Sequence, residues 1–465
     1  MQGALRVSDA APVHLSGREP HRFTWSTRRA YWVAAAALAL CLAPIMTTLS
    51  DGNIAVPDDG IYAKQAVILA DGTWSGTRPV SEIDESGLNS ALGPEITYDD
   101  RQIPYPRNPL FSTLLSLSYR LANYRGLVAF SVVGVWVASV AAGLLARMLD
   151  VRFGIPALLA TGLVSPLVFD TSLVSAHGMA AGMCGLTLLA LGQVVDRRRR
   201  LPLLVATVGA ALLVGLRTEG VIAMVATSIV LAMMAVQIRP FRVDRLAATA
   251  AASVVVATVS SYLASGYWTQ KIIENAGRTS SISRELSSDR SPLRAAWVSL
   301  IRPWYGTAVN AQPALVFAVI ATLVAAVSVK VAPRRWLLPV MLLVVAAGCV
   351  ITQAWAGSGL ITGLFSAFPA LGAGLILLRR EDLGRPMITR HLGISALTLA
   401  GITYAAYSVG GSAEWGGRFY HLLLPLLVPL VIVGLHHGYR SLPQRPARVA
   451  AVAIVVGLWG SPRSL

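Results

Sequence analysis

The chain is divided into repeated apolar blocks, and this pattern constrains its fold more than any other feature. The blocks are about 17–22 residues long, the length that an α-helix needs to cross a hydrocarbon core about 30 Å thick. A backbone inside such a core has no water to bond, so a crossing segment must form a helix. The pattern predicts about 13 membrane spans, at residues 31–49, 127–146, 154–172, 177–195, 201–216, 220–237, 246–264, 312–331, 336–352, 360–378, 389–407, 420–435 and 447–461.

The composition agrees with a membrane protein. Of the 465 residues, 55% are hydrophobic and only 13% are charged, whereas soluble proteins carry about 25% charged residues. The net charge of +16 would suggest nucleic acid in a soluble protein, but here the arginines occupy short loops. Cys41, Cys184 and Cys349 lie inside apolar blocks, which predicts packing residues rather than metal ligands or disulfides. We therefore expect an all-α, polytopic transmembrane helical bundle and no nucleic-acid partner.

Alternate loops of this bundle are short and rich in arginine. The positive-inside rule places such loops in the cytoplasm, together with the basic N-terminal tail 1–30, ahead of a transmembrane domain over 31–461. The block at 31–49 could instead be a signal peptide, but its length and long basic preface favour a retained first span of a multi-pass plasma-membrane protein. The basic loops hold Arg147 and Arg152; Arg197–Arg200; Arg239, Arg242 and Arg245; Lys330, Arg334 and Arg335; Arg379, Arg380 and Arg385; and Arg440, Arg445 and Arg448.

The opposite, extracytoplasmic side receives the two long loops, 50–125 and 265–311. The first loop is acidic, which contrasts with the basic loops across the membrane. Its acidic residues are Asp51, Asp58, Asp59, Asp71, Glu82, Asp84, Glu85, Glu95, Asp99 and Asp100. Candidate functional groups therefore collect on one side of the bilayer.

A short helix is predicted over residues 59–70 of the first loop. Asp58 or Asp59 stands at its start, and Asp71 followed by glycine ends it. Helical spacing places Asp58, Tyr62 and Gln65 on one face. The alternative is that Pro-Asp-Asp-Gly serves only as a turn and helix cap.

Three prolines between Arg101 and Leu110 predict an extended path before a second short helix. That helix, from Leu110 to Leu121, has an apolar face and is expected to lie at the membrane interface. The first extracytoplasmic loop is therefore predicted to hold two short interfacial helices with a loop between them.

Other candidate contacts lie at the outer ends of the spans. Arg418 suits a phosphate because its forked guanidinium keeps its charge, although an interfacial anchor is an equal alternative. Arg217 is interpreted first as part of an ion-paired turn with Glu219, and otherwise as a phosphate or sugar contact. His177 is either structural or a substrate contact.

Three segments resemble one family. The run from Asp58 to Ala66 (Asp-Asp-Gly-Ile-Tyr-Ala-Lys-Gln-Ala) resembles the Asp-Glu-x-x-Tyr-x-x-Gln-Ala opening of polyprenyl-phosphate-dependent glycosyltransferases of the GT-C fold. This group includes protein O-mannosyltransferases and aminoarabinose transferases. Asn108-Pro109-Leu110 is similar to the family's His-Pro-Pro-Leu element, and the run from Trp415 to Tyr420 is similar to its Trp-Gly-x-Arg-Phe/Tyr-x-x-Pro element. Two departures are the second acid, Asp59 rather than Glu, and the missing histidine of the proline-rich element.

The resemblance implies a GT-C-like bundle that transfers a sugar from a polyprenyl-phosphate donor to an acceptor hydroxyl on the extracytoplasmic side. It assigns Asp58 as the general base, with Asp59 assisting. No cofactor is expected, and a divalent metal is left open. The expected substrate-binding residues are Tyr62, Gln65, Arg107, His177, Arg217, Arg302, Glu414, Arg418 and Tyr420.

The sequence is also compatible with two other functions. The main alternative is a transporter or lipid flippase for cell-envelope precursors, but such proteins usually place ionisable residues near the middle of their spans. The third is a membrane scaffold without enzymatic activity. The chain has no P-loop and no glycine-rich dinucleotide-binding turn, which fits a lipid-linked donor rather than a nucleotide sugar.

Overall fold

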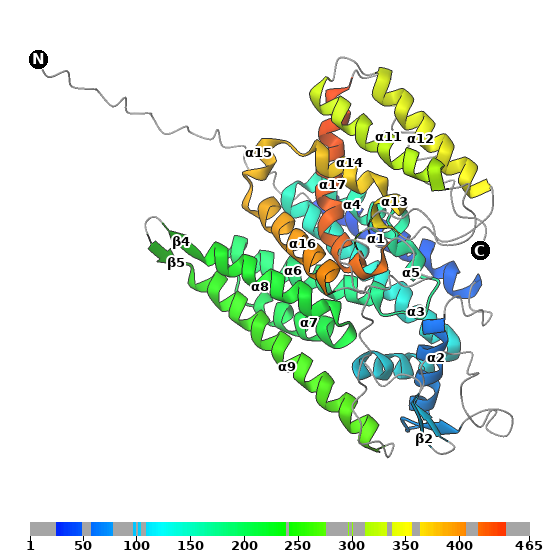
Figure 1. The fold of residues 1–465 in the computed structure, drawn as a ribbon. Coiled ribbons are helices and arrows are strands. Elements are labelled where there is room, and N and C mark those ends of the chain that lie inside the picture. Colours follow the sequence, from blue (N-terminus) through cyan, green and yellow to red (C-terminus); the bar gives the residue numbers. More distant parts are fainter. Residues whose placement is uncertain are drawn as a thin grey trace, which may run out of the picture.

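The computed structural model shows a predominantly helical protein (Figure 1). The predicted span at 447–461 lies outside the part of the chain that the structure describes. That part comprises residues 25–48, 57–77, 96–98, 101–103, 108–238, 241–275, 296, 300, 312–332, 337–355, 363–405 and 417–442.

The helices follow the other predicted blocks. They are α1 (Trp25–Thr48), α2 (Pro57–Ala70), α3 (Pro109–Leu149), α4 (Gly154–Leu159), α5 (Leu167–Asp170), α6 (His177–Arg197), α7 (Pro202–Leu216), α8 (Glu219–Ala235), α9 (Arg245–Asn275), α11 (Gln312–Val331), α12 (Leu337–Trp355), α13 (Leu364–Ala367), α14 (Pro369–Leu377), α15 (Arg380–Leu383), α16 (Pro386–Tyr404) and α17 (Leu424–Ser441). Short helices of other pitch are η1 (Val151–Phe153), the π-helical η2 (Ala160–Val164) and η5 (Arg418–Leu423).

The predicted helical membrane architecture is confirmed, whereas the number of spans stays a prediction. Within the described residues, four segments are long and apolar enough to cross a membrane: Pro109–Leu149, His177–Arg197, Arg245–Ile272 and Arg418–Ser441. Helices both inside and outside this group expose apolar side chains, as a lipid-facing surface requires. Examples are Val205 on α7, Val256 and Leu263 on α9, Ile320 on α11 and Met341 on α12.

Short strands depart from the all-α prediction. β1 (Gly76–Thr77), β2 (Ile96–Tyr98) and β3 (Arg101–Ile103) form an antiparallel sheet in the order β1-β3-β2. β4 (Val236–Ile238) and β5 (Phe241–Val243) form a hairpin, with Val236 opposite Val243. The predicted span 220–237 therefore ends as a helix at Ala235, because the β-branched and aromatic residues that follow suit a strand.

Two other predicted spans are interrupted rather than continuous. The block 154–172 contains α4, η2 and α5, and it breaks at Ser165, which is extended (φ −76°, ψ 161°) before Pro166. The block 360–378 breaks at Phe368 (φ −137°, ψ 69°) before Pro369. A proline disfavours the helical conformation in the residue that precedes it, and this explains both breaks.

Helix α9 runs past its predicted end at residue 264 to Asn275. The apolar pattern stops earlier because the last turns are polar. Within them Lys271 and Glu274 form an i,i+3 ion pair of 2.8 Å, which suits an exposed helix end. The helix therefore includes the first residues of the predicted extracytoplasmic loop 265–311, and the bounds of that loop stay a prediction.

Helix α3 consists of two helices that meet at a sharp bend. Ala122 (φ −145°, ψ 22°) and Asn123 (φ 54°, ψ −143°) are not helical. The first part, residues 109–121, matches the short helix predicted from Leu110 to Leu121, and the second part carries the predicted span 127–146. After the bend, Gly126 lies so close to the Ser118 carbonyl that a Cβ atom would clash with it.

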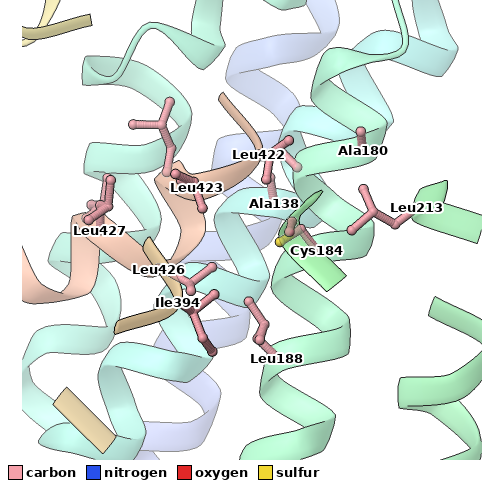
Figure 2. Close-up of a cluster of buried hydrophobic side chains, with 14 of the residues drawn as sticks. Ala138, Ala180, Cys184, Leu188, Leu213, Ile394, Leu422, Leu423, Leu426 and Leu427 are labelled. Carbon is pink, nitrogen blue, oxygen red and sulfur yellow. The ribbon is translucent and has the colours of Figure 1, made fainter. Parts of the chain in front are cut away.

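The core lies where α3, α6, α7, α16 and α17 meet (Figure 2). Its side chains are mostly small or aliphatic. Ala138, Cys184, Leu188, Leu213, Ile394 and Leu426 are among those drawn together in Figure 2. Of the three cysteines predicted to be packing residues, Cys184 is buried and Cys349 is partly buried, whereas Cys41 is exposed.

Glycines let two pairs of helices approach closely. In α17, a Cβ atom at Gly434 would lie on the carbonyl oxygen of Gly374 in α14. In α6, a Cβ atom at Gly178 would clash with Val135 of α3. Close backbone contact of this kind stabilises helix pairs in membranes, where the hydrophobic effect between helices is absent.

The arginine-rich turns gather at one end of the bundle, called here the arginine-rich end. Asp244 joins two of them, because it accepts a hydrogen bond from Arg198 (2.7 Å) and caps α9 through the N–H groups of Leu246 and Ala247. Burial raises the pKa of Asp244, but these hydrogen bonds outweigh it and hold the pKa below its ordinary value of 3.8. Figure 1 shows hairpin β4–β5 and α15 at this end, with α2 and β2 at the opposite end.

Candidate functional site

The candidate site lies at the other end of the bundle, where α6 and α8 begin and η5 packs against α6. His177 is the first residue of α6 and is 6% exposed. Arg217 follows the last turn of α7, and Glu219 is the first residue of α8. The sequence placed all three at the extracytoplasmic mouths of the spans, and the structure brings them together.

Arg217 and Glu219 form the predicted ion-paired turn. The guanidinium donates two hydrogen bonds to the carboxylate, from Nε to Oε2 (3.0 Å) and from Nη2 to Oε1 (2.8 Å). Glu219 is 1% exposed. A bidentate geometry holds the guanidinium plane in one orientation, so the turn is rigid.

Phe419 stands at the centre of the cluster. The guanidinium carbon of Arg217 lies 5.9 Å from the ring centroid, and that of Arg418 lies 5.5 Å from it. The His177 ring centroid is 6.2 Å away. One aromatic ring therefore gathers two guanidinium groups and an imidazole, an arrangement that suits an anionic ligand.

A buried pair of polar residues completes the cluster. His421 Nδ1 lies 2.8 Å from Asp170 Oδ2, and both side chains are fully buried. The His421 ring centroid is 6.3 Å from that of His177. Sequence reasoning missed this pair, although both residues are ionisable and lie inside the predicted spans 154–172 and 420–435. That position alone marks such residues as candidates for function.

Tyr420 was expected to bind substrate, but the structure places it in the core. It is 1% exposed, and its hydroxyl lies 2.8 Å from the hydroxyl of Thr403 on α16. It therefore holds η5 against α16. Its predicted role in binding substrate stays a prediction.

Helix α2 joins the cluster from the first loop. Its Tyr62 packs in a buried apolar group that also contains residues directly before His177 and Arg217. The buried members of this group, called here the α2 cluster, are Tyr62, Ala66, Phe111, Leu115, Leu127, Val174, Ala176 and Leu216. The predicted catalytic helix and the arginine–histidine cluster therefore share one end of the bundle.

The first part of α3 holds α2 in a parallel orientation. The rings of Tyr62 and Phe111 meet edge to face with centroids 4.8 Å apart. Further along, Arg120 Nε donates to the Ala70 carbonyl (2.9 Å), and its Nη2 bonds the Ala70 and Leu69 carbonyls. Arginine at a helix C-terminus satisfies unpaired carbonyls and complements the helix dipole.

This parallel packing sets the start of α2 beside the start of α3. Leu110, near the start of α3, packs on Gly215 at the end of α7. Gly215 is two residues from Arg217. The two helix starts that carry the first-loop motifs thus lie close to the arginine turn.

Of the remaining predicted site residues, the structure describes the side chain of Gln65 only. Gln65 is fully buried, and its amide donates to the Trp74 carbonyl (3.4 Å), so it packs within the first loop. Asp58 and Asp59 lie in the first turn of α2, but their side chains fall outside the described part of the structure, and their roles stay predictions. Also outside the described residues are Arg107, Arg302 and Glu414.

Among the described residues, no group of three or more His, Cys, Asp or Glu side chains is placed to hold a metal ion. Whether the protein uses a divalent metal ion therefore stays an open prediction. The chemistry that the described cluster offers is cationic and aromatic.

No protein-family model and no curated protein matches this chain. Among solved structures, it is similar to the oligosaccharyltransferase of Archaeoglobus fulgidus, in a crystal structure tethered to an acceptor peptide that contains the NVT sequon. The identity is 15% and the TM-score is 0.38, over 84% of this chain and 56% of that protein. The chain thus spans little more than half of its length, and a similarity this weak supports no conclusion about activity.

Proposed function

We propose that this protein is a membrane glycosyltransferase of the GT-C type. It would transfer a sugar from a polyprenyl-phosphate donor to an acceptor hydroxyl on the extracytoplasmic side of the plasma membrane. The observation that carries the proposal is the α2 cluster, in which Tyr62 packs with the residues that precede His177 and Arg217. The first-loop motif thus packs beside the residues that precede His177 and Arg217, and Phe419 of the last-loop motif lies against His177 and Arg217 themselves.

In the proposed reaction, Asp58 acts as general base at the start of α2. Its carboxylate accepts the proton of the acceptor hydroxyl, whose oxygen attacks the anomeric carbon of the donor sugar. A new C–O bond forms as the bond between that carbon and the phosphate oxygen breaks. The polyprenyl phosphate leaves with the electron pair. Proton transfer by a positioned carboxylate typically contributes about 10²–10⁴-fold to a rate.

The leaving phosphate needs positive charge at the oxygen where negative charge develops. Arg418 and Arg217 are the proposed donors, gathered on the ring of Phe419. Glu219 already balances part of the charge of Arg217, so we assign the larger share to Arg418. His177 borders the same ring and would offer a further hydrogen bond.

Transfer from a radiolabelled polyprenyl-phosphate sugar in isolated membranes tests the proposal. Asp58→Asn removes the base while keeping the side chain's size, so transfer should fall by about 10²-fold or more. Asp71→Asn is the matched control, since Asp71 is an exposed acid directly after the other end of α2. Unchanged transfer in Asp58→Asn, or an equal loss in Asp71→Asn, would remove Asp58 from this role.

One observation favours the alternative of a transporter or flippase. His391 of α16 is fully buried, and both of its ring nitrogens lack a hydrogen-bond partner among the described residues. Ionisable residues inside a membrane bundle often line a substrate path. Movement of a lipid-linked sugar across proteoliposomes, lost in His391→Leu and without any sugar transfer, would support this function instead.

A further inference from the structure

Asp170 and His421 form a bond that joins two distant parts of the chain. Asp170 ends α5, and His421 lies in η5, 251 positions later. Their bond is 2.8 Å long and both side chains are fully buried. They therefore do not lie on a surface that substrate could reach, and any role in the reaction has to be indirect.

Stability alone is a poor explanation for this pair. Removing a carboxylate and an imidazole from water is costly, and apolar residues of similar volume often serve stability better. The second carboxylate oxygen of Asp170, Oδ1, is also buried and has no hydrogen-bond partner among the described residues. An unsatisfied buried acceptor adds a further penalty. Because burying this pair costs free energy, its role is better explained by the positions in which it holds α5 and η5.

The bond fixes η5, on which the proposed phosphate-binding residue lies. His421 and Tyr420 anchor this short helix, one to α5 through Asp170 and the other to α16 through Thr403. Arg418 and Phe419 precede them in the same turn and face the arginine–histidine cluster. A shift of η5 would therefore move Arg418.

The same bond also fixes the segment that leads into the start of α6. Asp170 and His177 bracket the short connection 171–176 between α5 and α6. His177 lies close to both His421 and Phe419. Loss of the bond would therefore loosen both sides of the cluster at once.

We propose that Asp170 and His421 are positioning residues, which hold Arg418 and His177 in place for the donor phosphate. This inference rests on the proposed function. The pair itself touches no substrate and transfers no proton in the reaction. Its loss should weaken binding of the phosphate more than it slows the chemical step.

Kinetics with the donor sugar separate positioning from a general loss of structure. Asp170→Leu and His421→Leu should raise the KM for the donor by about tenfold, the size expected for loss of one charge-assisted hydrogen bond. The fall in kcat should be smaller than this rise in KM, and it is expected because Arg418 also meets the charge that develops on the leaving phosphate. His421→Asn should restore the donor KM, because its amide can replace Nδ1–H. An unchanged KM in both leucine variants would overturn the inference.

The ion pair between buried Arg390 and exposed Asp196 provides a control at the arginine-rich end. Its two hydrogen bonds are 2.9 and 2.7 Å long, and Arg390 is 3% exposed. Asp196→Leu should leave the donor KM unchanged, whatever it does to stability. A rise in KM equal to that of Asp170→Leu would show that loss of a partner from any buried charged side chain has this effect, and would also overturn the inference.

Direct binding to the purified full chain separates this inference from the proposed function. Farnesyl phosphate should bind the wild type more tightly than farnesol, which has the same chain without the phosphate. If it does not, the proposed function fails. If it does, and Asp170→Leu binds it with wild-type affinity, only the positioning role fails.

A second comparison holds even if the leucine variants do not fold. His421→Gln and His421→Asn both keep an amide, but only Asn carries its donor near the position of Nδ1. His421→Asn should therefore retain the wild-type affinity for farnesyl phosphate, and His421→Gln should lose about tenfold. Equal affinities of the two variants would overturn the positioning role.

Discussion

At the scale of single residues, Phe419 explains why several charged groups can stand so close together. Its ring centroid lies 5.9 Å from the guanidinium carbon of Arg217 and 5.5 Å from that of Arg418. A cation over an aromatic face is stabilised by about 0.5–2 kcal/mol, with the larger value where water is excluded. The ring therefore offsets part of the repulsion between the guanidinium groups, and an incoming phosphate would offset more.

The first prediction concerns Arg418. Arg418→Gln should reduce donor affinity by roughly tenfold to a hundredfold, because it removes a charge-assisted hydrogen bond. Arg418→Lys should recover only part of the loss, since an ammonium group keeps the charge but loses the planar fork. The donor KM in the radiolabelled assay measures both effects.

Arg199→Gln serves as the control for charge alone, because Arg199 is exposed at the arginine-rich end. It should leave the donor KM unchanged. Equal KM values for Arg418→Gln and the wild type would show that Arg418 is an interfacial anchor rather than a phosphate ligand.

At the scale of elements, the two helices of the first loop, α2 and the first part of α3, are held together by specific contacts. Arg120 closes the C-terminal end of α2, and the contact between Tyr62 and Phe111 fixes its middle. The bend at Ala122 and Asn123 then turns α3 into the bundle. The proposed base helix is thus held by the same chain segment that begins the next membrane helix.

The sequence predicted these elements where local signals were strong. The helix over 59–70 and the helix from Leu110 to Leu121 both exist, because caps, prolines and an apolar face define them locally. It did not predict the bond between Asp170 and His421, which depends on two segments meeting in space. Nor did it predict hairpin β4–β5, whose pairing takes over the last residues of an apolar block.

The second prediction concerns the contact between α14 and α17. Gly434→Ala should destabilise the protein by about 1–3 kcal/mol, the usual cost of overpacking, because the new Cβ atom would lie on the Gly374 carbonyl oxygen. Thermal unfolding in detergent, followed by circular dichroism, measures the change.

The same substitution at Gly266 provides the control. Gly266 lies in α9, where an added Cβ atom would meet nothing within 4 Å. Gly266→Ala should stabilise the protein by about 0.4–1 kcal/mol, through helix propensity and a less flexible unfolded chain. Equal midpoints for the two variants would show that α14 and α17 are not in close contact.

At the scale of the whole molecule, the two ends of the bundle differ in chemistry. One end joins arginine-rich turns through ion pairs such as Arg198–Asp244 and Arg390–Asp196. The other end gathers His177, Arg217 and Phe419 of η5, and α2 packs there against the residues that precede His177 and Arg217. Alternation of basic and other loops along the sequence predicted this division without any knowledge of the packing, because each span carries the chain to the opposite end.

The last prediction tests which end of the bundle faces which side of the membrane. In a variant in which Cys41, Cys184 and Cys349 are replaced by alanine, a new cysteine at Thr73 or at Arg199 reports on one end each, since both positions are exposed. Thr73→Cys should react with a membrane-impermeant maleimide in intact cells, and Arg199→Cys should react only after the membrane is opened. The physical reason is that arginine-rich turns are retained in the cytoplasm. Reaction of both from the same side would contradict the proposed topology and would leave the site without access to an extracytoplasmic acceptor.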